Sequence, residues 1–152
     1  MSLRYKAVSR VVTAALLALL MAGCASAPKG AFIKPVDGVI TSNYGSRKGG
    51  FHHGIDIAAR RGTIVRAAQS GRVVFRGRRK GFGRLIIIDH GRGLETYYAH
   101  LSRYKTRRGK KVRRGDAIGK VGSSGRSSGP HLHFELRQNG RSMNPAGVVP
   151  FR

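Results

Sequence analysis

The chain has 152 residues, and 30 of them are Lys or Arg against only 6 Asp and Glu, which gives a formal net charge of +24. A surface with this excess of positive charge binds polyanions. Nucleic acid is not the expected partner, because the sequence has no zinc finger, no RNP aromatic motif and no basic helix. The single Cys also excludes a closed metal site built from several thiolates.

The first 23 residues have the pattern of a secretory signal peptide. Basic residues precede an apolar run at 11–22, which is shorter than the roughly 20 residues that a membrane-spanning helix needs. The run ends in Leu-Met-Ala-Gly-Cys at 20–24, which resembles the lipobox of bacterial lipoproteins, where cleavage precedes a cysteine that is then lipidated. We therefore expect lipidation of Cys24 and a short tether at 24–32. A short transmembrane anchor and a lone catalytic cysteine are the alternatives.

The predicted leader places the protein in the cell envelope, held by a lipid. Ala25 after the cysteine resembles lipoproteins that are passed to the outer membrane, so in a two-membrane bacterium the domain would face the periplasm. The polyanions available there are membrane surfaces and the carboxylate-bearing cell-wall polymer. We expect the chain to contact both.

Residues 33–152 have the length of one domain and the pattern of an all-β fold. Turn-like, Gly-rich stretches separate the segments that we predict to be strands. These segments are 63–67, 72–75, 84–89, 95–100, 117–121 and 131–137. We expect a single antiparallel β-sheet domain with barrel or sandwich character and a groove walled by loops. Residues 85–88 are all apolar and predict a central strand buried on both faces, while the basic stretches 76–84 and 103–114 predict surface loops.

Four side chains in two short stretches indicate a metal site. Polar and apolar residues alternate at 129–136, so His131 and His133 would point to the same face of a strand. His52 and Asp56 are four residues apart, which also places them on one face of an extended segment. His52, Asp56 and His133 would supply two imidazole nitrogens and a carboxylate oxygen, a set suited to Zn²⁺ with one open position. For the His-x-His pair alone, one packed and one solvated histidine is the competing interpretation.

The remaining histidines differ in what their positions predict. His100 ends the predicted strand 95–100 at a loop, from which a side chain can reach a site, although a solvated strand end is the simpler interpretation of that stretch alone. His53 and His90 are predicted to be structural or exposed. Glu135 can share the face of His133, and we interpret it as a supporting partner rather than a base.

Together these stretches resemble the lysostaphin-like zinc metallopeptidases, the M23 peptidase family, also called LytM domains. The matching motifs follow in the family's order at 52–56, 62–67, 71–74, 97–101, 115–119, 128–135 and 143–145. The resemblance implies that His52, Asp56 and His133 bind Zn²⁺, and that His100 and His131 face the attacking water without binding the metal. It also implies that Tyr44 and Arg47 lie in a loop beside the substrate groove.

The function that this resemblance implies is a zinc endopeptidase that cleaves the peptide cross-links or stems of peptidoglycan. The residues do not say which of His100 and His131 is the base. The Gly-rich loop 122–129 is predicted to form one wall of the groove, and it lacks the spacing of a serine nucleophile elbow. The alternative is a catalytically silent activator of cell-wall amidases or an envelope-binding lipoprotein, which would contact cell-wall enzymes or regulators. All five implied site positions carry competent residues, which favours the enzyme.

Overall fold

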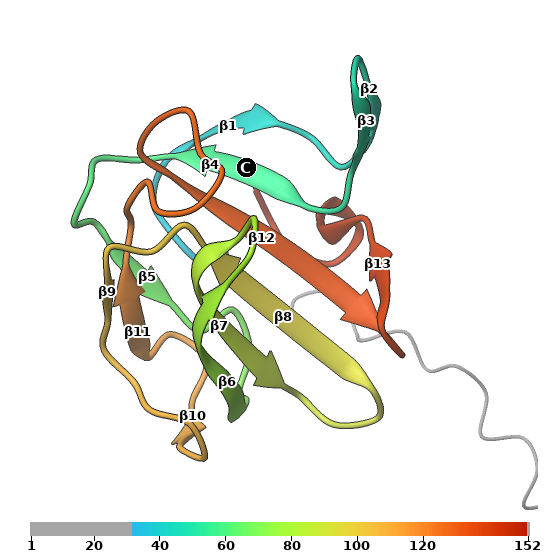
Figure 1. Cartoon of the computed structure of the whole chain (residues 1–152). Helices are drawn as coiled ribbons and strands as arrows, with labels where there is room; N and C mark the ends of the chain where they lie inside the picture. Colours follow the sequence, from blue (N-terminus) through green and yellow to red (C-terminus); the bar gives the residue numbers. More distant parts are fainter. Residues whose placement is uncertain (1–31, 152) are drawn as a thin grey trace, which may run out of the picture.

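The computed structural model describes residues 32–151, and almost all regular structure in this range is β-strand (Figure 1). One 3-10 turn follows the last strand, at Pro145–Gly147. The strands are β1 Val39–Ser42, β2 Gly45–Arg47, β3 Gly50–His52, β4 Ile55–Ala58, β5 Ile64–Arg66, β6 Gly71–Arg79, β7 Gly83–Asp89, β8 Leu94–Ala99, β9 Arg103–Tyr104, β10 Lys111–Val112, β11 Ala117–Lys120, β12 His131–Gln138 and β13 Arg141–Met143.

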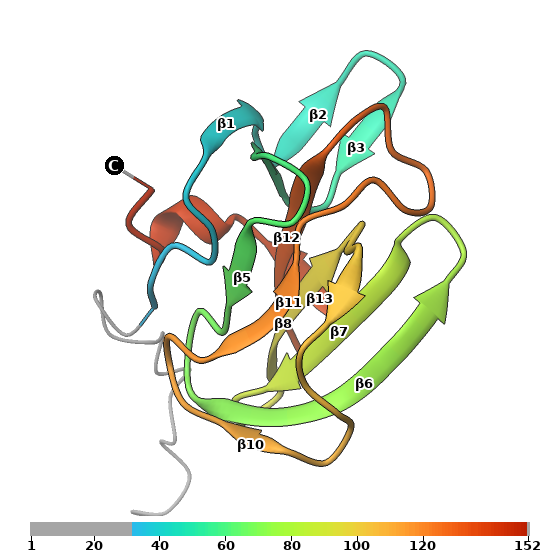
Figure 2. The ribbon, with the colours of Figure 1, turned by 90° about the vertical axis from the view of Figure 1, so that its left-hand side faces the viewer.

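The strands form one large sheet and two small ones (Figures 1 and 2). The large sheet has the order β1-β4-β12-β8-β7-β6-β10, and β13 also pairs with β12. A three-stranded sheet has the order β5-β11-β9, and β2 and β3 form a separate hairpin. The strand pairs are antiparallel, so the predicted antiparallel all-β domain is confirmed. Within residues 32–151 the large sheet does not close into a barrel, because its order ends at β1 and β10.

Strand β7 lies inside the large sheet, between β6 and β8, and both of its faces are covered. Ile86 and Ile88 belong to the main core, whereas Leu85 and Ile87 pack in a second cluster with Tyr97 of β8. Alternate residues of a strand point to opposite faces. The prediction of a central strand buried on both faces is therefore confirmed.

The basic stretch at 76–84 is not the surface loop that the sequence predicted. Its first part continues β6 to Arg79, and its last part begins β7. β10 pairs with β6 only at Gly71 and Arg72, so most of β6 runs along the rim of the sheet, where charged side chains are common because they discourage edge-to-edge association. One of these arginines also packs on an aromatic ring, since the Arg76 guanidinium lies 4.3 Å from the ring centre of Tyr104.

The chain enters the described fold at Phe32, which is 1% exposed and packs edge-on against His90. The next residue, Ile33, donates its backbone N–H to Ala68 O. The predicted signal peptide, Cys24 and the tether up to residue 31 lie outside the described residues. Among the residues that are described, no helix has the length and apolar character needed to cross a membrane.

Candidate active site

Strand β12 carries the centre of the site on one face and part of the core on the other. His131, His133 and Glu135 alternate along the strand toward the site. The intervening residues are buried in the main core, and they are Leu132, Phe134 and Leu136. This arrangement confirms the predicted alternation, with the two histidines on the same face.

Asp56 and His52 reach the same face from two different strands. Asp56 lies on β4, directly opposite His133 of the neighbouring β12. His52 is the last residue of β3, and His53 and Gly54 form a bend between β3 and β4. A side chain at Gly54 would place its Cβ 2.4 Å from Phe134 O, so only glycine allows this close crossing. The four-residue spacing therefore brings His52 and Asp56 together through a bend rather than along one continuous strand.

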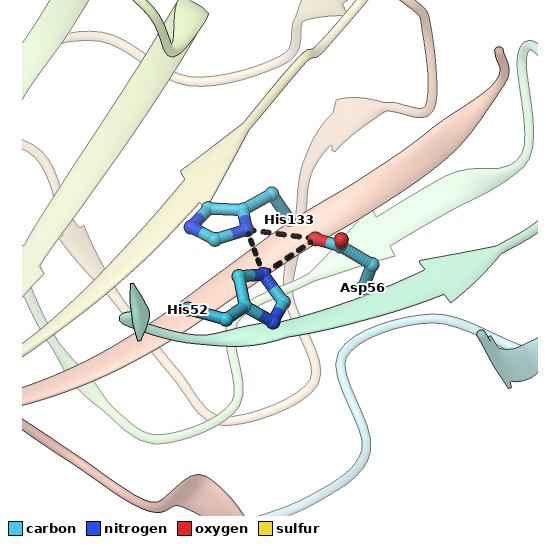
Figure 3. Close-up of side chains that lie close together, drawn as sticks. All are labelled: His52, Asp56 and His133. Atoms are coloured by element: carbon cyan, nitrogen blue, oxygen red, sulfur yellow. Dashed lines mark hydrogen bonds and ion pairs between the residues drawn. The ribbon is translucent and has the colours of Figure 1, made fainter. Parts of the chain in front are cut away.

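Three ligand atoms converge at this point, as Figure 3 shows. Asp56 Oδ1 lies 2.7 Å from His133 Nδ1 and 3.2 Å from His52 Nε2. The two imidazole nitrogens lie 3.2 Å apart. In a tetrahedral zinc site with Zn–N bonds of about 2.0–2.1 Å, neighbouring ligand atoms are about 3.3 Å apart. The three atoms therefore already have nearly the separation that a shared Zn²⁺ requires.

Hydrogen bonds on the far side of each imidazole set which nitrogen carries the proton. His52 Nδ1–H donates to Asn43 O at 2.7 Å, which leaves the Nε2 lone pair facing Asp56. His133 Nε2–H donates to Glu135 Oε1 at 2.9 Å, which leaves the Nδ1 lone pair facing the same point. Two imidazole lone pairs and a carboxylate oxygen thus point at one another. Such a set is repulsive unless a proton or a cation lies between its members.

The pKa values of this cluster reflect that convergence. Burial lowers the pKa of His133, but its hydrogen bonds to Asp56 and Glu135 and their negative charges outweigh burial and raise the pKa to about 9. Burial raises the pKa of Asp56, and the hydrogen bond and charge of His133, with the charges of His52 and His131, reverse this and lower it. The cluster therefore attracts positive charge strongly.

Glu135 is only 2% exposed and is held from two sides. Its Oε1 faces His133, and its Oε2 accepts a hydrogen bond from Arg137 Nε at 2.6 Å. The Arg137 guanidinium in turn lies 4.5 Å from the ring centre of Tyr97. Burial raises the pKa of Glu135, but the hydrogen bonds and charges of His133 and Arg137 outweigh burial, and the net effect lowers the pKa. The carboxylate therefore stays charged and fixes the orientation of the His133 ring.

His100 and His131 present a second pair of imidazole nitrogens to the same space. His100 Nδ1–H donates to Ser124 O at 2.7 Å, and His131 Nδ1–H donates to Gly129 O at 2.9 Å. Both Nε2 atoms are therefore available as acceptors. The two rings have centres 4.7 Å apart, and His131 Nε2 lies 3.8 Å from Asp56 Oδ1. Burial lowers the pKa of His100, in part opposed by its hydrogen bond to Ser124 O.

A cleft with a volume of about 670 Å³ opens over these side chains. The loop 122–129 contributes one wall, as predicted, through residues such as Arg126. Arg47 also lines the cleft, where it donates to Ser42 Oγ at 3.2 Å and lies 3.9 Å from Asp56 Oδ2. Tyr44 does not line the cleft; its ring packs edge-on against Phe51, which does.

Two aromatic residues that shape the cleft were not predicted from the sequence. Phe82 lines the cleft with its ring centre 5.9 Å from that of His133, and Phe51 lines it as well. No motif marked these residues, although Phe82 stands in a Gly-Phe-Gly turn. His53, predicted to be structural or exposed, lies at the cleft and contacts Ser142 Oγ at 2.9 Å.

His90 has the structural role that was one of its predicted alternatives. Nδ1 lies 2.8 Å from Ser70 O, and Nε2 lies 2.8 Å from Thr96 Oγ1. The Thr96 hydroxyl is 2.9 Å from Tyr98 OH, which also accepts the Ala68 N–H. These contacts link three chain segments away from the cleft.

Comparison with known proteins assigns the family. The sequence profile of Peptidase family M23 matches residues 50–145, which include the three clustered side chains and both further histidines. The chain is 53% identical over 98 residues to the DD-carboxypeptidase/endopeptidase Mpg of Neisseria meningitidis serogroup B. It is 41% identical over 128 residues to the murein hydrolase activator NlpD of Salmonella dublin.

These matches cover most of this chain but only a part of the relatives. The match to Mpg covers 64% of this chain and 23% of Mpg, and the match to NlpD covers 84% of this chain and 33% of NlpD. Among solved structures, the catalytic domain of the antimicrobial peptidase lysostaphin from Staphylococcus simulans is similar with a TM-score of 0.67 and 34% identity, over 71% of this chain and 89% of that domain. The chain belongs to Peptidase family M23.

Proposed function

We propose that this domain is a zinc-dependent endopeptidase that hydrolyses peptide bonds in the cross-links or stems of peptidoglycan. The observation that carries the proposal is the convergence of His52 Nε2, Asp56 Oδ1 and His133 Nδ1 within 3.2 Å of one another at the floor of an open cleft. Three protein ligands with a fourth position facing a cleft are typical of catalytic rather than structural zinc sites.

The donor set and its surroundings fit Zn²⁺. Imidazole nitrogens and a carboxylate oxygen are ordinary zinc ligands, and each imidazole is held by a hydrogen bond on its other nitrogen, to Asn43 O or to Glu135. Zinc held by His52, Asp56 and His133 would supply a Lewis acid that polarises a carbonyl and lowers the pKa of water to about 7. Proton transfer and stabilisation of the oxyanion are left to side chains of the protein.

His100 and His131 are assigned the proton transfers. Each ring is fixed through Nδ1 by a backbone carbonyl, so each Nε2 is left to accept a proton from the attacking water. The ring that is protonated can then donate a hydrogen bond to the oxyanion of the tetrahedral intermediate or return the proton to the leaving amine. Their separation of 4.7 Å between ring centres allows both to face one scissile peptide bond.

The charges of the cleft suit an anionic substrate. Arg47 and Arg126 both line the cleft, whereas its acidic groups, Asp56 and Glu135, contact the histidines and Arg137. Peptidoglycan stems carry carboxylates, so long-range attraction should raise the rate of association. Because exposed charges are screened by salt, we expect digestion to slow as ionic strength rises.

An activator of cell-wall amidases is the second candidate, because the match to NlpD spans a larger share of this chain than the match to Mpg. An activator does not require five functional groups in this geometry. The presence of competent side chains at all five positions therefore favours turnover. The two functions are also compatible in one domain that binds the same polymer.

The deciding experiment is mass spectrometry of cross-linked peptidoglycan after incubation with residues 25–152, with zinc and with a chelator. New amino termini that need zinc support the endopeptidase and identify the scissile bond. His133→Ala serves as the metal-site control. If wild type produces no new termini but increases the product of an added cell-wall amidase, the activator is correct and the endopeptidase is excluded.

We also propose that the protein is a lipid-anchored component of the cell envelope, held at Cys24. The proposal rests on the leader pattern at 1–23. In a two-membrane bacterium the expected place is the periplasmic face of the outer membrane. Incorporation of labelled fatty acid into wild type, and its absence from Cys24→Ala, is the test.

A further inference from the structure

A strongly basic surface lies away from the cleft, and we refer to it as the basic end. It is built around β10 and the start of β6, where a hollow of about 670 Å³ lies between Arg72, Lys111 and Arg113. All of its cationic residues are exposed. They are Arg66, Arg72, Arg107, Arg108, Lys110, Lys111, Arg113 and Arg114.

Contacts with the backbone tie this surface together. Arg72 Nη1 donates to Gly109 O at 2.8 Å, and Arg66 Nη1 donates to Gly115 O at 3.0 Å. The neighbouring carboxylates are few. Asp116 accepts the Arg113 N–H, and Asp89 lies opposite Arg72 in the sheet and accepts the Gly91 N–H. Positive charge therefore dominates this end of the domain.

The chain enters the domain beside the basic end. Ile33 N–H donates to Ala68 O, and Ile33 Cδ1 lies 3.9 Å from the position that a Cβ on Gly115 would take. Cys24 precedes Phe32 by eight residues, which span at most about 29 Å when fully extended. A lipid on Cys24 would therefore keep this end of the domain within about 29 Å of the bilayer.

The cleft lies at the opposite end of the large sheet. Strand β7 begins at Gly83, next to the cleft residue Phe82, and ends at Asp89, which pairs with Arg72 of the basic end. Six residue steps along a strand separate the two ends by about 20 Å. In Figure 2, β10 lies at the bottom of the view and the β2–β3 hairpin, whose residues Arg47 and His52 line the cleft, lies at the top.

We propose that the basic end binds the phosphate-bearing headgroups of the anchoring membrane and so holds the cleft away from the bilayer, toward the cell wall. The inference rests on the proposed anchor at Cys24 but not on peptidase activity. A flexible lipid anchor keeps the domain near the bilayer but does not fix its orientation, and a basic patch beside the tether supplies a second contact with anionic headgroups. The attraction decays within a Debye length of about 8 Å. Only one end of the domain can therefore use it at a time, and the proposal assigns this role to the basic end, which gathers eight exposed cations and also lies beside the tether.

A second basic group makes the test specific, because the whole chain is cationic. Arg76, Arg78, Arg79 and Lys80 lead into the turn that reaches the cleft residue Gly81, and they offer the same charge at the far end. Neutralising four cations at either end changes the net charge equally. General attraction predicts equal effects, whereas the proposed orientation predicts unequal ones.

The experiment measures co-sedimentation of residues 25–152 with vesicles of phosphatidylcholine and phosphatidylglycerol. This segment contains the whole described fold, and the similar lysostaphin catalytic domain was crystallised as a separate chain. The basic-end variant replaces Arg107, Arg108, Lys110 and Lys111 with Gln. Each cation beside an anionic bilayer strengthens binding roughly fivefold, so we expect the partition coefficient to fall by at least about 30-fold.

The control variant replaces Arg76, Arg78, Arg79 and Lys80 with Gln, and its partition coefficient should fall by less than about threefold. Equal losses in the two variants, or wild-type binding that is as strong to pure phosphatidylcholine vesicles, would overturn the proposal. Circular dichroism of both variants shows whether they are folded. If wild type binds anionic vesicles but digests no peptidoglycan, the peptidase is rejected and this inference still stands.

Labelling tests the orientation directly. Residues 25–152 contain no cysteine, so a polarity-sensitive fluorophore can be attached to Lys110→Cys at the basic end or to Lys48→Cys at the tip of the β2–β3 hairpin. Anionic vesicles should shift the emission of the first probe and leave the second nearly unchanged. Equal shifts at both positions would refute a preferred orientation.

Discussion

Replacing Glu135 with Gln tests whether the support behind His133 matters for zinc binding. In the wild type, both carboxylate oxygens accept hydrogen bonds, one from His133 Nε2 at 2.9 Å and one from Arg137 Nε at 2.6 Å. A Gln side chain has one oxygen and one NH₂ group. Whichever way it is turned, its NH₂ group faces a donor, either the His133 ring or the Arg137 guanidinium. The substitution therefore preserves size but makes one of the two hydrogen bonds impossible.

The expected loss follows from the burial of the pair. Glu135 is 2% exposed, so water cannot replace the lost hydrogen bond, and an unsatisfied buried donor costs about 1–3 kcal/mol. Partners behind metal-bound histidines typically contribute 10- to 100-fold to metal affinity, which corresponds to about 1.4–2.7 kcal/mol. We expect the zinc affinity of Glu135→Gln to fall within this range. The stability gained on adding zinc should fall by the same amount.

The assay is competition with a chromophoric chelator near neutral pH, combined with thermal unfolding with and without zinc. Glu95→Gln is the matched control, because Glu95 lies on the neighbouring β8 opposite Arg137 and accepts the Tyr97 hydroxyl without contacting His133. Zinc affinity should be nearly unchanged in the control. If both variants lose affinity equally, or if Glu135→Gln stays within about threefold of wild type, the supporting role of Glu135 is wrong.

Three further predictions concern histidines. We expect His133→Ala to lose bound zinc and His100→Ala to keep it while losing turnover; equal zinc loss, measured by elemental analysis, would contradict the division of roles. Burial lowers the pKa of His90 in the folded state below 6.5, although the hydrogen bond that its ring donates to Ser70 O and the charges of Asp89 and Glu95 act in the opposite direction. The unfolded chain therefore binds the proton of His90 more tightly than the folded protein does, and the free energy of unfolding falls as pH is lowered through 6.5. In urea unfolding, the free energy of unfolding of His90→Gln should fall less steeply with decreasing pH than that of wild type. Backbone φ at His100 is 59°, so His100→Gly should be more stable than His100→Ala by about 1 kcal/mol in urea unfolding; the reverse order would show that the backbone there is not strained.

Alternating sequence patterns predicted the parts of the site that lie on regular strands. His131, His133 and Glu135 follow the period of β12, and the fully apolar run of β7 marked the centre of the sheet. Local spacing also identified His52 and Asp56, although the chain bends between them. Such patterns succeed because burial on one or both faces of a strand is imposed by the sheet itself.

Features that depend on contacts distant in sequence were not predictable in this way. The carbonyls of Asn43, Ser124 and Gly129, which orient three imidazoles, carry no sequence signal because every residue has a carbonyl. The extension of β6 through its arginines was missed because charged residues usually indicate loops. At the rim of a sheet, one edge of a strand faces solvent, so charge there costs little.

The placement of His100 shows why a site of this kind requires an irregular backbone. Tyr97 and Ala99 lie opposite Glu135 and His133 and so share the cleft face of the sheet, whereas Tyr98 points into the main core. A regular continuation of β8 would send His100 to the core side with Tyr98. The left-handed conformation at His100, with φ of 59°, ends the strand and turns the ring toward His131 instead, at a cost of about 1–2 kcal/mol. Two hydrogen bonds hold this conformation: His100 N–H donates to Phe82 O at 2.9 Å, and the His100 ring donates to the loop 122–129. The loop that forms one wall of the cleft therefore also fixes the imidazole that is proposed to transfer protons.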